Sequence, residues 1–160
     1  MKIGVISDTH LKKPTRLLED TVQKYFLDVD LIIHAGDLVT LDILDAFRDK
    51  EVIAVAGNND GPEMKGLLPE KEIITAGDFK IGIMHGRGWP MHMGKKISKQ
   101  FKGVDCLVYG HSHWPASYYR DGVFLFNPGA FSGSLPFPWR RTIGILTIDK
   151  GIHGRVIPIT

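Results

Sequence analysis

Seven side chains of the types that bind divalent metal ions stand out in this sequence because they fall into five short motifs. In chain order they are Asp8, His10, Asp37, Asn58, His85, His111 and His113. The first two and the last two are each separated by one residue, and in extended backbone such side chains point the same way. The other three each adjoin a glycine, which leaves room for an ion or a phosphate oxygen. We therefore expect the seven to act together at one site.

Each motif follows an apolar run that is typical of a buried strand. We expect these strands over residues 3–6, 31–33, 52–56, 79–84 and 106–109. Binding sites in open sheets form outside the carboxyl ends of the strands. The five motifs are therefore predicted to converge on one crevice.

The remaining apolar patterns predict how these strands are connected. Helical patterns over 17–26 and 41–47 alternate with the first strands, and this β-α-β-α-β order predicts a parallel sheet. Strands dominate after residue 70, with further strands expected over 72–76, 117–120, 123–126, 143–148 and 152–157 and a helix over 95–101. We expect an α/β fold in one domain over residues 1–160. Its predicted architecture is a four-layer αββα sandwich, in which two mixed β-sheets pack face to face with helices outside.

Composition narrows the class of protein. The chain has 160 residues, of which 43% are hydrophobic and 24% charged, and these fractions are typical of a globular domain. The formal net charge of +2 predicts no stable nucleic-acid partner. No apolar run reaches the ~18 residues that span a bilayer. The N-terminus lacks a secretion signal, so we expect no membrane association and a cytoplasmic location.

The five motifs resemble those of the calcineurin-like metallophosphoesterase superfamily. The matching segments are Asp8-Thr9-His10, Gly36-Asp37, Gly57-Asn58-Asn59-Asp60, His85-Gly86 and Gly110-His111-Ser112-His113. The short chain and the turn at Asn127-Pro128-Gly129-Ala130 are similar to the small bacterial and archaeal phosphodiesterases of that superfamily. The retromer vacuolar sorting subunit of eukaryotes resembles the same subgroup.

This resemblance implies two divalent metal ions and a division of the ligands between them. The ligands implied are Asp8, His10 and His113 for one ion, Asn58, His85 and His111 for the other, and Asp37 as the bridge. Imidazole, carboxylate and amide ligands suit Mn, Ni, Fe, Co or Zn better than Ca or Mg, and Mn is the ion that we expect. The reaction implied is hydrolysis of a phosphodiester by in-line attack of a hydroxide that bridges the two ions.

Two further residues are predicted to bind substrate. Asn59 stands where larger members of the superfamily carry a histidine that is thought to act on the leaving group. An amide donates a hydrogen bond but cannot transfer a proton at neutral pH, so we expect a preference for good leaving groups. Arg87 either reaches a phosphate oxygen or is exposed to solvent. The loop at 89–92 either lines a substrate pocket or covers core.

Three functions stay open at this point. The leading one is hydrolysis of a small phosphodiester substrate, and the runner-up with the same chemistry is a phosphomonoesterase or nucleotide phosphatase. The third is a non-catalytic scaffold with the same fold, but the eukaryotic relative has lost a ligand whereas all seven are present here. Apolar side chains in the segment 132–139 would be exposed unless they pack or pair, which allows a homodimer.

Overall fold

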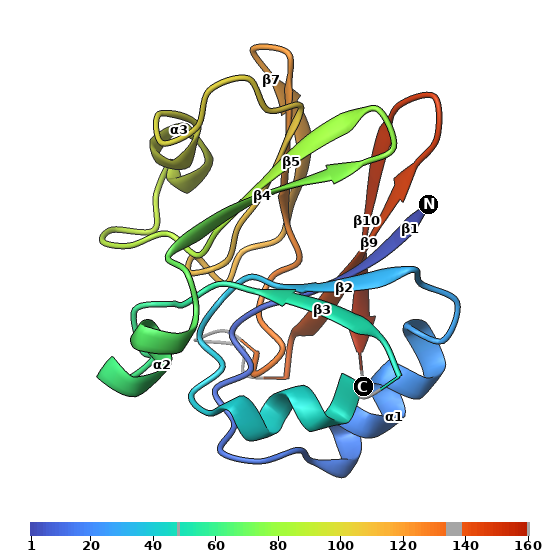
Figure 1. Cartoon of the computed structure of the whole chain (residues 1–160), viewed down its shortest axis with the longest axis vertical. Coiled ribbons are helices and arrows are strands. Elements are labelled where there is room, and N and C mark those ends of the chain that lie inside the picture. The colour runs from blue at the N-terminus through green and yellow to red at the C-terminus, as the bar shows by residue number, and fades with distance from the viewer. Residues whose placement is uncertain (48, 134–138, 160) are drawn as a thin grey trace.

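The computed structural model describes residues 1–47, 49–133 and 139–159, and its strands form two mixed five-stranded sheets (Figure 1). The first sheet has the order β10-β9-β1-β2-β3. Its parallel strands are β1 (Lys2–Ile6), β2 (Leu31–His34) and β3 (Glu51–Ala54). The last two strands, β9 (Arg141–Ile148) and β10 (Ile152–Ile159), form a hairpin that pairs with β1 in antiparallel register.

The second sheet has the order β4-β5-β6-β8-β7. Three central strands run parallel: β5 (Phe79–Met84), β6 (Cys106–Val108) and β8 (Val123–Asn127). The edges are β4 (Lys71–Ala76) and β7 (Ala116–Arg120), and each pairs with its neighbour in antiparallel register. The strands expected over 72–76 and 79–84 therefore form one hairpin, and those expected over 117–120 and 123–126 form another.

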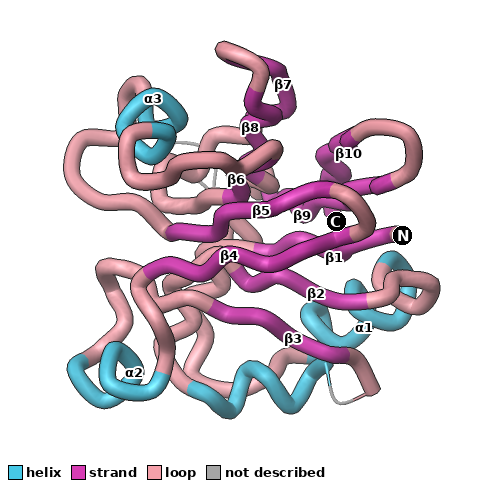
Figure 2. Tube along the Cα trace, turned by 45° about the horizontal axis from the view of Figure 1, so that its top comes forward, coloured by secondary structure: helices cyan, strands magenta, loops and turns pink. Residues whose placement is uncertain are grey.

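The two sheets pack face to face, with helices on both outer faces (Figure 2). The core between them includes Val5 and Ile33 from the first sheet and Ile83, Val108 and Phe126 from the second. A second core lies beneath α1 (Arg16–Tyr25) and the 3-10 helix η1 (Leu41–Phe47) on the first sheet. A third lies beneath α3 (Met93–Ser98) on the second sheet. The predicted αββα sandwich is confirmed.

The helices follow the sequence pattern less closely than the strands do. The Thr15 hydroxyl caps α1 by accepting a hydrogen bond from the Leu18 amide at 3.3 Å, because the first amides of a helix have no partner inside it. The segment 41–47 is a 3-10 helix, whereas its spacing had favoured an ordinary helix. The short α2 (Pro62–Leu67) was not predicted. Within the part of the chain that is described, no helix is long and apolar enough to cross a membrane.

Both sets of parallel strands bring their carboxyl ends to the same side of the sandwich. Strands β1, β2 and β3 are followed by the loops of Asp8, Asp37 and Asn58, and β5 and β6 by those of His85 and His111. Contacts between side chains of the two groups show that these loops meet. Residues 134–138, which include Leu135 and Phe137 of the predicted apolar loop, lie outside the described residues, and the homodimer stays a prediction.

Candidate metal centre

The structure brings all seven predicted ligand side chains together between the two sheets. Asp8 Oδ1 lies 3.0 Å from His113 Nε2, and Asp37 Oδ2 lies 3.3 Å from His85 Nε2. The same nitrogen of His85 lies 3.1 Å from the side-chain oxygen of Asn58. The members of the cluster come from five loops, in the order Asp8, His10, Asp37, Asn58, His85, His111 and His113.

One oxygen of Asp8 is anchored to the protein. Asp8 Oδ2 accepts a hydrogen bond from the Ser7 hydroxyl at 2.5 Å and another from the His111 amide at 3.2 Å. Ser7 is itself buried at the end of β1. These two bonds set the orientation of the carboxylate and connect the loop after β1 to the loop after β6.

The other oxygen of Asp8 faces three imidazoles. Its Oδ1 atom lies 3.0 Å from Nε2 of His113 and 3.8 Å from Nε2 of both His10 and His85. This oxygen is buried and lacks a properly oriented hydrogen bond from any described residue. A buried carboxylate oxygen without a hydrogen bond is costly, whereas one that faces several imidazole nitrogens is a suitable metal ligand. The residues present therefore fit a divalent ion at this place.

Asp37 lies between the same imidazoles. Its Oδ2 atom is 3.3 Å from Nε2 of His85 and 3.7 Å from Nε2 of His10. Asn59 holds the carboxylate in place, because its backbone amide donates to Oδ1 at 2.8 Å and its side-chain amide donates to Oδ2 at 2.7 Å. In this structure the Asn59 side chain thus contacts Asp37, and its contact with substrate stays a prediction.

Two of the imidazoles are oriented by backbone carbonyls. His85 Nδ1 lies 2.7 Å from the carbonyl of Ala35, and His111 Nε2 lies 2.6 Å from the carbonyl of Gly88. A carbonyl only accepts hydrogen bonds, so these nitrogens carry protons. In the neutral imidazoles the lone pairs are then on His85 Nε2 and His111 Nδ1, and both face the side-chain oxygen of Asn58. Histidine ligands of metals are commonly oriented in this way.

The carboxylates and the imidazoles shift each other's protonation. Burial opposes ionisation of Asp8 and Asp37 and is the largest single effect on each, but the nearby imidazoles and hydrogen-bond donors together outweigh it and lower the pKa of both carboxyls. Burial also opposes the charged form of His85, yet the nearby carboxylates of Asp37 and Asp8 together raise its pKa. For His113 the close contact with Asp8 is the largest effect, and it raises the pKa. The two carboxylates thus attract cationic charge, which a metal ion supplies as well as a proton does.

Two groups of acidic and imidazole side chains converge closely enough to hold an ion. Asp8, His10 and His113 form one group, and Asp8, Asp37 and His85 form the other, with ligand atoms within 4.8 Å of one another in each. The first group is the ligand set that the family resemblance implies for one ion. Asp8 belongs to both groups, and Asp37 Oδ2 also lies near histidines of both.

The backbone at the centre is not extended, although extended backbone was the reason for expecting Asp8 and His10, and His111 and His113, to point the same way. Five of the seven residues have positive φ angles: Asp8 (54°), His10 (50°), Asp37 (59°), His111 (63°) and His113 (57°). Such left-handed conformations are unfavourable for residues other than glycine, and they cluster at functional sites. The paired motifs do place their side chains together, but they do so through left-handed turns after the strands have ended.

Two of the neighbouring glycines are required by close packing. A side chain at Gly57 would collide with Asp37, and one at Gly110 would collide with the Ser7 hydroxyl and with Asp8 Oδ2. These glycines therefore let the backbone lie against the carboxylates, whereas the expected room for an ion or a phosphate oxygen beside them stays a prediction.

Several supporting residues were not found from the sequence. Asp60 accepts hydrogen bonds from the amides of Asp37, Val39 and Gly57, and so connects the loops after β2 and β3. Its position in the Gly57-Asn58-Asn59-Asp60 motif is a signal, but the motif does not tell which groups the carboxylate contacts. Asn127 donates to the Gly110 carbonyl at 2.9 Å, which holds the loop that carries His111.

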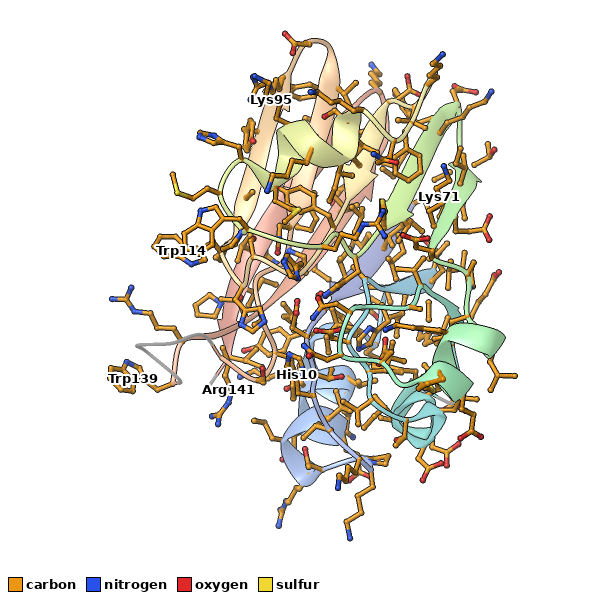
Figure 3. The ribbon with its side chains drawn as sticks, turned by 90° about the vertical axis from the view of Figure 1, so that its left-hand side faces the viewer. His10, Lys71, Lys95, Trp114, Trp139 and Arg141 are labelled. Atoms are coloured by element: carbon orange, nitrogen blue, oxygen red, sulfur yellow. The ribbon has the colours of Figure 1, made fainter. Side chains whose placement is uncertain are left out.

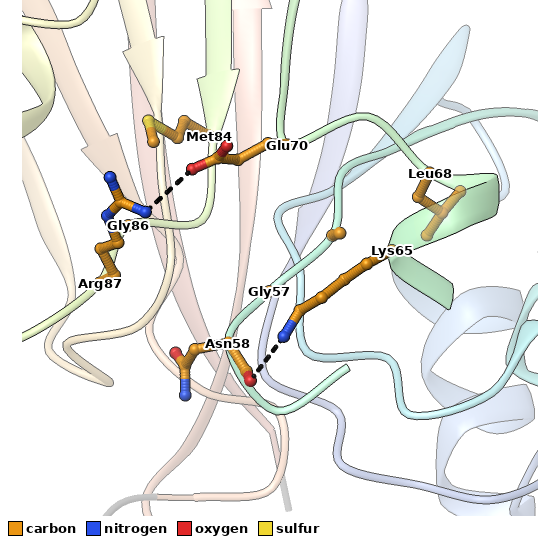
Figure 4. A pocket seen from close by; sticks show the side chains of 9 residues that line it. Gly57, Asn58, Lys65, Leu68, Glu70, Met84, Gly86 and Arg87 are labelled. Atoms are coloured by element: carbon orange, nitrogen blue, oxygen red, sulfur yellow. Dashed lines mark hydrogen bonds and ion pairs between the residues drawn. The ribbon is translucent and has the colours of Figure 1, made fainter. Parts of the chain in front are cut away.

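Arg87 lies beside the centre on an exposed surface. Its guanidinium is 3.7 Å from the Glu70 carboxylate, and both side chains are largely exposed. The two residues line a cavity of about 390 Å³ together with Asn58 and Lys65 (Figure 4). Lys65 Nζ donates to the Asn58 carbonyl at 3.1 Å. Of the alternatives for Arg87, exposure is what the structure shows, and contact with a phosphate stays a prediction.

Comparison with known proteins supports the same assignment of family. A family model described as the calcineurin-like phosphoesterase superfamily domain matches residues 1–151. A probable metallophosphoesterase of Methanocaldococcus jannaschii is 39% identical over 99% of this chain and 82% of its own length. A phosphodiesterase of the same organism is 29% identical over 98% of this chain and 99% of its own length.

Solved structures show the same fold. A structure described as a novel archaeal phosphodiesterase has a TM-score of 0.78 and 28% identity, and covers 99% of this chain and 100% of its own. Wild-type Vps29 from Entamoeba histolytica, solved in complex with Zn²⁺, has a TM-score of 0.74 and 25% identity, with both chains fully covered. With the family model matched over most of its length, this chain belongs to the calcineurin-like phosphoesterase superfamily.

Proposed function

We propose that this protein is a metal-dependent phosphodiesterase whose centre holds two divalent ions. The observation that carries the proposal is the position of Asp8 Oδ1 and Asp37 Oδ2, which each face imidazole nitrogens from more than one loop. Asp8 Oδ1 is buried without an oriented hydrogen bond from any residue that is described, so a cation satisfies it best. The family membership supports the hydrolysis of a phosphoester.

The ligands would be divided as the resemblance implies. One ion would be held by Asp8, His10 and His113, the other by Asn58, His85 and His111, and Asp37 would contact both. The mixture of carboxylate, imidazole and amide ligands favours Mn among divalent ions, with Ni, Fe, Co and Zn as further candidates. When bound, two such ions lower the pKa of a water molecule and neutralise the charge that builds on the phosphoryl oxygens.

The chain's own residues prepare the site for this chemistry. Ser7 and the His111 amide fix the plane of the Asp8 carboxylate, and Asn59 fixes that of Asp37. The carbonyl of Gly88 holds the proton of His111 at Nε2, so that Nδ1 faces inward. Preorganised ligands of this kind need little rearrangement when an ion or a substrate enters.

A phosphodiester is the favoured substrate class for two reasons. The resemblance to the small phosphodiesterases of the superfamily is one, and Asn59, which cannot protonate a leaving group, adds a preference for stable leaving groups within that class. A phosphodiesterase is also among the relatives that match almost the whole chain. Hydrolysis of phosphomonoesters by the same centre is the alternative, and so is a scaffold role, since Vps29 shares the fold.

The test is hydrolysis of bis(4-nitrophenyl) phosphate and of 4-nitrophenyl phosphate by metal-stripped protein to which Mn, Ni, Zn or Mg is returned. We expect metal-dependent turnover, faster with the diester, and its loss in Asp37→Ala and Asn58→Ala. The control is Asp78→Asn, which removes an exposed carboxylate in the β4–β5 turn and should leave turnover unchanged. Faster turnover of the monoester would favour the alternative substrate class. Absence of turnover with every metal, despite metal binding, would favour the scaffold.

A further inference from the structure

A second cavity lies beside the loop that carries His111 and His113. Its volume is about 420 Å³, which is within the range of small-molecule sites. The residues that define its chemistry are Pro90, Met91, Tyr109, Trp114, Pro115 and Tyr118. Its described lining contains no aspartate, glutamate, lysine or arginine, whereas the cavity at Arg87 contains three charged side chains.

Each wall of this cavity belongs to a loop that either carries or contacts a predicted metal ligand. One wall begins at Ser112, between His111 and His113, and continues directly to Trp114. The Ser112 hydroxyl accepts a hydrogen bond from the Asn127 side chain at 3.0 Å, which fixes this loop. The opposite wall begins just after Gly88, whose carbonyl contacts His111 Nε2 at 2.6 Å. A molecule bound in this cavity therefore lies next to the centre.

The lining suits a flat, uncharged ring. The Trp114 side chain is 71% exposed and projects toward solvent (Figure 3), and Met91 is also largely exposed. Single exposed apolar side chains are common, whereas several that gather around one cavity mark a candidate contact surface. Tyr109 is buried at the base, where its hydroxyl and that of Tyr118 both lie close to Gly94. Aromatic walls with a few polar groups at the base are typical of sites that stack a ring.

We propose that this cavity binds an aromatic group carried by one of the two ester arms of the phosphodiester substrate, with Trp114 as the stacking surface. The inference rests on the proposed function, because it places the phosphate at the metal centre. It adds a substrate class, namely diesters in which at least one arm carries an aromatic ring, such as a nucleobase or a phenyl group. Alkyl diesters would leave the cavity empty.

The test compares the binding of phenylphosphonate and methylphosphonate to Mn-loaded protein by calorimetry. Both probes carry a phosphonate for the centre and a carbon–phosphorus bond that hydrolysis does not cleave, and only one carries a ring. We expect the parent protein to bind phenylphosphonate about tenfold more tightly, which corresponds to the stacking of one ring. Trp114→Ala should lose this preference without weakening methylphosphonate, and Trp114→Phe should retain most of it.

The matched control is Trp139→Ala. Trp139 is 67% exposed, nearly as much as Trp114, but it lines neither cavity, so its replacement should leave the preference unchanged. Equal affinity of the parent for the two phosphonates, or equal effects of the two tryptophan replacements, would overturn the inference and point to a partner surface instead. Turnover of bis(4-nitrophenyl) phosphate, measured separately, reports on the proposed function. A ring preference without turnover would support the cavity and refute only the reaction.

Discussion

At the scale of single residues, the centre depends on how its carboxylates are held. The side-chain amide of Asn59 donates to Asp37 Oδ2 at 2.7 Å, and this is the oxygen that lies nearest His85. Residues that orient a ligand in this way commonly change metal affinity by 10- to 100-fold when removed, as a rough guide. Asn59 is therefore predicted to act on metal binding as well as on the leaving group.

The contact between the Asn59 side chain and Asp37 can be removed by a single substitution. Asn59→Ala should weaken Mn binding to the stripped protein by about tenfold, because Asp37 would lose its side-chain hydrogen bond and gain rotational freedom. Equilibrium dialysis with Mn measures the dissociation constants. Lys65→Met serves as the control, because the Lys65 ammonium donates to the backbone carbonyl of Asn58 and to no predicted ligand side chain among the described residues. Unchanged affinity in Asn59→Ala would show that the backbone amide alone suffices to hold Asp37.

The buried imidazole of His34 is expected to make the free energy of unfolding depend on pH. It is fully buried at the end of β2, beside the Thr9 hydroxyl, and burial lowers its pKa to about 4 from an ordinary value of 6.5. Between these two values the unfolded chain binds more protons than the folded chain, so the free energy of unfolding falls as the pH falls through this window. The His34 contribution to this loss is roughly 2–3 kcal/mol near pH 4.5.

Urea unfolding of metal-free protein near pH 7 and near pH 4.5 measures this contribution. His34→Leu should lose less stability between the two pH values than the parent does, by about that amount. His153→Leu, which replaces an exposed histidine on β10, should behave as the parent. If His34→Leu and the parent lose the same stability, proton uptake by His34 does not oppose folding.

At the scale of elements, Asp60 joins the loops that carry Asp37 and Asn58. It accepts hydrogen bonds at 3.1 Å, 2.7 Å and 2.7 Å from the amides of Asp37, Val39 and Gly57. Val39 has a φ of 81°, which is unfavourable for a β-branched residue and has to be held by its surroundings. Asp60 supplies part of that support.

We predict that Asp60→Ala lowers the free energy of unfolding by about 3 kcal/mol, because three buried amides lose a charged acceptor. Asp60→Asn should lose less, because one oxygen is retained. Glu63→Ala, which removes an exposed acidic side chain from the first turn of α2, should change stability little. Urea unfolding at neutral pH measures all three. A loss in Asp60→Ala no larger than that in Glu63→Ala would contradict the structural role.

The elements also show how far the sequence predicts the structure. Strand positions followed from apolar runs, since buried strands need continuous apolar side chains, and β5 at Phe79–Met84 matches its predicted range. The short α2 gave little signal, because it spans only Pro62–Leu67 and contains Gly66. The left-handed turns at Asp8 and His111 were not foreseen, because non-glycine residues disfavour them and only tertiary contacts hold them there.

The site itself was predictable only as a set of residues. The seven ligand types could be found because each adjoins a strand end, and strand ends of parallel sheets meet. The contacts that orient them could not be found, since Ser7 precedes Asp8 without any distinctive pattern, and Asn127 and the Gly88 carbonyl lie far along the sequence from the groups that they hold. The order of the strands within each sheet is a further tertiary property that no local pattern contained.

At the scale of the whole molecule, the two sheets approach each other closely where Phe126 packs on glycines. A side chain added at Gly154 on β10 would lie 2.5 Å from the Phe126 ring. Gly154→Ala should therefore destabilise the protein by about 1–3 kcal/mol, as overpacked cores do. Gly151→Ala in the adjoining turn is the control, because the nearest atom would be 3.8 Å away. Thermal unfolding measures both, and equal midpoints would contradict this packing.

The three apolar cores lie in consecutive layers and support the proposal that residues 1–160 form one domain. The centre lies where the two sheets meet, so its ligands come from both: Asp8, Asp37 and Asn58 follow the first sheet, and His85 and His111 follow the second. Packing between the sheets thus sets the separation of the ligands. Loss of that packing is expected to weaken metal binding as well as stability.

The most direct test of a two-ion centre is a titration of metal-stripped protein with Mn, in which bound Mn per chain and turnover of bis(4-nitrophenyl) phosphate are measured on the same samples. We expect that two ions bind per chain and that turnover rises only as the second ion binds. Binding of a single ion, or turnover that reaches its maximum before the second ion is bound, would contradict a two-ion centre.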